Sequence, residues 1–119
     1  MDPNKINKKT INIPIYGFKL TIIFNKNLDG VIKKYKLTGN FEDLGALTFE
    51  SDLKYRHIIV TFNDANDLSI VAHEIVHIKN YIFLRIGATV DLNNDEPEAY
   101  LTGWLFDQIN DFLKKFRSE

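Results

Sequence analysis

The stretch from Leu68 to Arg85 constrains the fold of this chain more than any other segment. Asp67 before it suits a helix N-cap and Gly87 after it suits the C′ position, so we expect one helix between them. Its apolar residues recur at intervals of three and four, which is the helical period: Val71, Ile75, Ile78, Ile82 and Ile86. Because Ala72, Val76 and Phe83 extend this stripe, we expect the helix to be buried between a sheet and another helix.

His73, Glu74 and His77 supply the chemistry of this helix. Two histidines four residues apart lie on one helical face, where both imidazoles can reach one metal ion. The glutamate between them can reach a water molecule on that metal. This spacing predicts a zinc site. The third histidine, His57, has no partner at metal spacing, and we interpret it as a surface or strand-end residue.

Length and composition exclude several classes of protein. A chain of 119 residues forms one domain, 1–119, with a single core. Its net charge of −1 argues against a nucleic-acid or membrane-surface partner. There is no cysteine, so a metal must be held by His, Asp or Glu. No apolar run is long enough to cross a membrane and the N-terminus lacks signal-peptide features, so we expect a cytoplasmic protein.

Four short segments rich in β-branched and aromatic residues predict strands: 11–16, 18–24, 46–49 and 57–62. Pro14 cannot donate a ladder hydrogen bond, so the first strand should lie at a sheet edge. Residues 1–10 should be loose, 28–35 a short helix, and Gly39 to Gly45 a loop.

The last helix is expected over residues 95–116, with Asp95 as N-cap and Glu98 completing a capping box. Pro97 suits its first turn. The prediction is therefore an α+β domain. A small, mostly antiparallel sheet packs on the helix of His73, and the last helix closes the site.

A catalytic zinc ion usually takes three protein ligands, so two histidines leave one ligand to find. The candidates at the start of the last helix are Asp95, Glu96 and Glu98. Glu98 lies near the apolar stripe of that helix and should point inward. Glu96 shares its face with Ala99 and Gly103, whose small side chains would let the two helices cross closely. The residues alone leave both glutamates open.

The combination His73-Glu74-x-x-His77 and Glu96-x-x-Ala99-x-x-x-Gly103 resembles the gluzincin pattern of metallopeptidases. The second motif is similar to that of ImmA/IrrE-type peptidases, and both motifs resemble small zincin-like proteins encoded by phages and prophages. The likeness covers residues 57–106. It implies a zincin-like fold and favours Glu96 over Glu98 as third ligand. Many gluzincins carry an acid where this chain has Tyr100. In those proteins the acid supports a ligand histidine, so the resemblance does not imply such support for His73 or His77.

The resemblance implies a zinc-dependent metallopeptidase that hydrolyses a peptide or protein substrate. Zinc would acidify its water, and Glu74 would take the proton and pass it to the leaving amine. Tyr100 or Tyr81 could donate to the oxyanion, on residue type alone. By analogy with zincins, strand 57–62 or 46–49 could pair with an extended peptide. The alternatives are a structural zinc joining two helices and a non-catalytic module that binds a host or phage protein. The sequence carries no signal for an oligomeric state.

Overall fold

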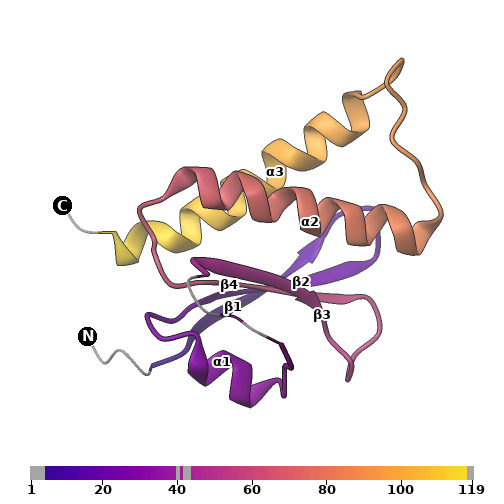
Figure 1. Ribbon diagram of the computed structural model, residues 1–119. Coiled ribbons are helices and arrows are strands. Elements are labelled where there is room, and N and C mark those ends of the chain that lie inside the picture. Colours follow the sequence, from indigo (N-terminus) through magenta and orange to yellow (C-terminus); the bar gives the residue numbers. More distant parts are fainter. Residues whose placement is uncertain (1–4, 40, 42–43, 118–119) are drawn as a thin grey trace.

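The computed structural model describes residues 5–39, 41 and 44–117, and it has an α+β architecture (Figure 1). Part of the loop expected over Gly39 to Gly45 lies outside these residues. The elements in chain order are β1 (Asn7–Ile13), β2 (Phe18–Phe24), α1 (Asp29–Lys34), β3 (Ala46–Glu50), β4 (His57–Phe62), α2 (Leu68–Ile86), α3 (Glu96–Leu113) and a 3₁₀ turn, η1 (Lys114–Phe116). None of the helices in the described residues is long and apolar enough to cross a membrane.

The four strands form one mixed sheet in the order β1-β2-β4-β3. β1 pairs antiparallel with β2, and β3 pairs antiparallel with β4, but the central pair β2–β4 is parallel. β1 is an edge strand, as predicted. It begins at Asn7, because that residue pairs with Phe24 at the end of β2, so the expectation that residues 7–10 are loose is wrong. It ends at Ile13, before the turn that contains Pro14.

The helices cover the sheet unequally: α2 and α3 lie on one face and α1 lies on the other (Figure 1). The large core between the sheet and α2/α3 includes Ile58, Ile78 and Leu105. A smaller cluster of Ile23, Val31 and Ile59 lies under α1. Ile58 and Ile59 therefore serve opposite faces of β4, as the alternation of a strand requires.

α2 has the predicted caps. The Asp67 carboxylate accepts hydrogen bonds from the backbone N–H groups of Ser69 and Ile70, and Gly87 adopts φ 72°. As predicted, the helix packs against both the sheet and α3, but the rest of its surface is exposed. Val76 is 48% exposed and Ile86 is 36% exposed. The expectation of burial on several sides is therefore wrong for these two residues.

α3 differs from the prediction at its N-terminal end. Asp95 precedes the helix but its side chain makes no capping hydrogen bond. The Glu98 carboxylate contacts the Lys79 ammonium of α2 instead, so the expected capping box does not form. A Cβ atom built on Gly103 would meet no atom within 4 Å. The small residues on this face therefore do not serve a close helix crossing. The expectation that they would let α3 cross α2 closely is wrong.

Candidate metal centre

His73 and His77 lie one turn apart on α2, and their Nε2 atoms are 3.2 Å apart. Both side chains are exposed, with 68% of the His73 side chain accessible. Two nitrogen ligands of a tetrahedral zinc ion, each about 2.0–2.1 Å from it, lie about 3.3 Å apart. The two imidazoles therefore fit a shared metal ion, and their exposure leaves room for further ligands.

Glu74 lies beside this pair but is buried, with 5% of its surface exposed. Its Oε2 atom is 3.8 Å from His73 Nε2. Its Oε1 atom accepts a hydrogen bond of 2.7 Å from the hydroxyl of Thr48 on β3. Because a buried carboxylate is costly without hydrogen bonds, this bond is what makes its position tolerable.

The sequence interpretation missed Thr48. A signal exists, because Ala46, Thr48 and Glu50 alternate along β3 and so share one face of the sheet. Which helix that face meets depends on the strand order, which alternation does not reveal.

His73, Glu74 and His77 offer ligand atoms that all lie within 4.8 Å of one another. Neither Glu96 nor Glu98 belongs to this group. α3 reaches α2 at Lys79, which lies about 120 to 160° around the helix from the two histidines. The last helix therefore packs on the opposite flank of α2 and does not close the site over the histidines. Ligation by Glu96, which is exposed at the start of α3, stays a prediction.

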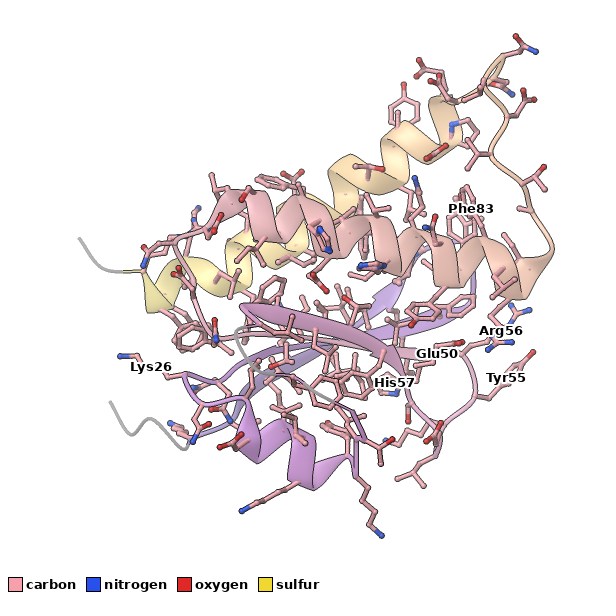
Figure 2. The ribbon with its side chains drawn as sticks, in the orientation of Figure 1. Lys26, Glu50, Tyr55, Arg56, His57 and Phe83 are labelled. Carbon is pink, nitrogen blue, oxygen red and sulfur yellow. The ribbon has the colours of Figure 1, made fainter. Side chains whose placement is uncertain are left out.

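A second contact ties β3 to α2, more than two helical turns beyond His77. Arg85 donates to both carboxylate oxygens of Glu50, at 2.7 and 2.6 Å. Hydrogen bonding by Arg85 holds the pKa of Glu50 below its usual range. Figure 2 shows Glu50 at the end of the sheet where the chain turns through Tyr55 and Arg56 towards β4. With Thr48–Glu74, this pair fixes the edge strand along the helix.

The tyrosines considered as oxyanion donors lie in different places. Tyr100 is exposed on α3 and lines a hollow of about 700 Å³ together with Ile15 and Trp104. None of the residues that line this hollow belongs to the His73 group. Tyr81 follows His77 by one helical turn and is half-buried against the core. The structure therefore does not bring Tyr100 to the metal group.

His57 begins β4 and lies on the opposite face of the sheet, since it alternates with Ile58 and shares the side of Ile59. Its Nε2 atom is 2.6 Å from the hydroxyl of Thr21, which also bonds that of Thr10 at 2.8 Å. Its Nδ1 atom is buried and has no partner among the described residues. Burial, and then the charges of two nearby lysines, hold the pKa of His57 below the usual value. His57 is therefore at the end of a strand, as predicted, and its side chain is hydrogen-bonded to Thr21.

The described residues support the first motif of the resemblance, an HExxH group on a helix packed against a small mixed sheet. They do not join the second motif to it, because Glu96 lies outside the group. Comparisons with protein-family models, with curated proteins and with solved structures find no match for this chain.

Proposed function

We propose that the chain binds a zinc ion through His73 and His77 and hydrolyses a peptide bond, with Glu74 as general base. The observation that supports this proposal is the pair of Nε2 atoms 3.2 Å apart beside a buried carboxylate. A bound zinc ion supplies the positive charge that acidifies water and polarises a carbonyl group. Glu74 has one oxygen held by Thr48, and its other oxygen faces His73 and is available to accept a proton. The resemblance to phage-encoded zincin-like proteins remains part of this proposal.

A second function is favoured by one observation. A carboxylate oxygen of Glu74 lies within 4.8 Å of the ligand atoms of both histidines, so Glu74 can itself be the third ligand. A site of this kind would bind metal without a general base, as in a non-catalytic binding module. The structural-zinc alternative has less support, because all three donors belong to α2 and an ion there would not join two helices.

Zinc affinity separates these functions before any substrate is known. We would measure it by competition with a chromogenic chelator for wild type, His73→Ala, Glu74→Gln, Glu96→Ala and Glu98→Ala. His73→Ala should weaken binding on the order of a hundredfold or more, because a direct ligand is lost. Glu74→Gln should stay within about threefold of wild type if Glu74 is the base. A loss as large as that of His73→Ala would instead make Glu74 a ligand.

The two remaining variants identify the third ligand. A large loss in Glu96→Ala with no loss in Glu98→Ala would support the gluzincin pattern and require α3 to approach the histidines. If wild type takes up no zinc from a stoichiometric solution, both functions are wrong.

Hydrolysis is the next measurement. The zinc-loaded protein would be incubated with a peptide library and the cleavage products read by mass spectrometry. Cleavage should disappear in Glu74→Gln and on chelation. It should persist in Asp111→Asn, which makes the same change from carboxylate to amide at an exposed position on α3. Cleavage that survives in Glu74→Gln would exclude Glu74 as the base.

A further inference from the structure

We infer that Thr48 is a positioning residue, which holds the Glu74 carboxylate in the orientation that the candidate metal centre needs. This inference rests on the proposed function, since it concerns the same centre. The Thr48 hydroxyl donates to Glu74 Oε1 at 2.7 Å, and both residues are buried, with 8% and 5% of their surfaces exposed. Among the hydrogen bonds of the described residues, this hydroxyl bonds Glu74 and neither of the two histidines, so it acts through Glu74.

The hydrogen bond gives the two oxygens of the Glu74 carboxylate different surroundings. With Oε1 engaged by Thr48, Oε2 is the oxygen that faces His73, at 3.8 Å. A hydrogen bond to a charged acceptor is roughly twice as strong as a neutral one, and burial strengthens it further. A glutamate side chain has three rotatable bonds, so without this donor the carboxylate can turn away from the imidazoles towards water.

Thr48 is itself held in place from two directions. It pairs with Val60 in the register of β3 and β4. Two residues further along β3, the bidentate contact of Glu50 with Arg85 ties the strand to α2. Its branched Cβ also restricts its rotamers. The donor therefore sits on a fixed part of the scaffold rather than on a loop, which is what positioning another side chain requires.

The sheet offers a matched control for this hydroxyl. Thr61 on β4 is fully buried, but its hydroxyl has no hydrogen-bond partner among the described residues. The substitutions Thr48→Val and Thr61→Val remove the same atom from neighbouring strands, Thr61 being paired with Leu47. An effect of the hydroxyl on Glu74 should follow the first substitution alone.

The experiment uses acetohydroxamic acid as a probe, because it chelates zinc and its O–H group can donate a hydrogen bond to an adjacent carboxylate. We would measure two dissociation constants, that of zinc and that of the hydroxamate on the zinc-loaded protein. The proteins are wild type, Thr48→Val, Thr48→Ser, Thr48→Ala and Thr61→Val. Thr48→Val should keep zinc affinity within about twofold and weaken hydroxamate binding about 10- to 100-fold, the usual effect of an outer hydrogen-bond partner. Thr48→Ser should restore binding, and Thr61→Val should match wild type.

The outcomes separate this inference from the function on which it rests. If zinc and hydroxamate affinities in Thr48→Val equal those of Thr61→Val, the positioning role is wrong while the proposed function stands. If Thr48→Val weakens zinc itself and Thr48→Ser restores it, Thr48 still positions Glu74, but as a ligand. If wild type binds no zinc, the proposed function and this inference fall together. Thermal unfolding of each variant checks that it is folded. If Thr48→Val does not fold, Thr48→Ala tests the same loss of the hydroxyl.

Discussion

The two faces of the sheet use polar residues in opposite ways. On the face covered by α2, a large apolar core contains the buried contact of Thr48 with Glu74, which leads out to two exposed histidines. On the face covered by α1, a hydroxyl chain crosses the sheet and ends on His57. The first arrangement connects two layers, and its two exposed imidazoles contact each other through their Nε2 atoms. The second connects neighbouring strands, and its imidazole contacts a threonine hydroxyl. What each histidine can bind therefore depends on its exposure and on its hydrogen-bond partners.

The adjacent residues Ile58 and Ile59 test how unequal the two faces are. Both are almost fully buried, at 0% and 2% exposure, but they point to opposite faces. We expect Ile58→Ala to lower the free energy of unfolding by about 4 kcal/mol, because it leaves a cavity in the large core. Ile59→Ala should cost about 2 kcal/mol, because a three-residue cluster can collapse around the gap. Urea unfolding with equal m-values measures both, and equal losses would contradict the comparison.

Substitutions of His77 and His57 should have opposite effects on zinc affinity and on stability. His77→Ala should weaken zinc binding on the order of a hundredfold and change stability by less than about 0.5 kcal/mol, since the side chain is exposed. His57→Ala should leave zinc binding unchanged and lower the free energy of unfolding by about 1 kcal/mol, because Thr21 loses a hydrogen bond. Chelator competition and urea unfolding on the same samples give both values. A loss of zinc affinity in His57→Ala would show that the two faces are not independent.

A smaller effect is the pH dependence that His57 contributes. Its pKa in the folded protein is lowered, chiefly by burial and then by Lys54 and Lys19, so the unfolded chain binds the proton first as pH falls. The contribution of His57 to the free energy of unfolding is therefore fully present above its pKa in the unfolded chain, which is about 6.5. It declines as pH falls from there towards the pKa in the folded protein. Unfolding curves from pH 8 to 5 should show this decline in wild type and a weaker one in His57→Gln. The two proteins should coincide in slope above pH 7.

Elements with strong local signals were predicted correctly. Asp67 and Gly87 marked the ends of α2, and the spacing of His73 and His77 is sufficient to bring their nitrogens together within one helical turn. β2 matched its predicted range because five of its seven residues are β-branched or aromatic. In each case the interactions that decide the outcome lie within a few residues.

Features that depend on distant partners were not predicted. The parallel pairing of β2 with β4 and the role of Thr48 both follow from strand order, which local patterns do not contain. Asp95 and Glu98 fit a capping box, but Lys79 on another helix competes for the Glu98 carboxylate. Glu96 and Gly103 suggested that α3 would reach the histidines, whereas the helix packs on the other flank of α2.

The hydrogen bond between Thr48 and Glu74 also implies an order of assembly. The histidine pair needs one turn of α2, which forms in well under a millisecond, so it can exist before the rest of the domain. Thr48 lies 26 residues before Glu74, and it arrives only when β3 has docked through its pairing with β4. Pairing two strands takes on the order of microseconds, which is slower than forming a helical turn. During folding the two imidazoles can therefore come together before the Glu74 carboxylate is oriented, because only the second step needs the docked strand β3.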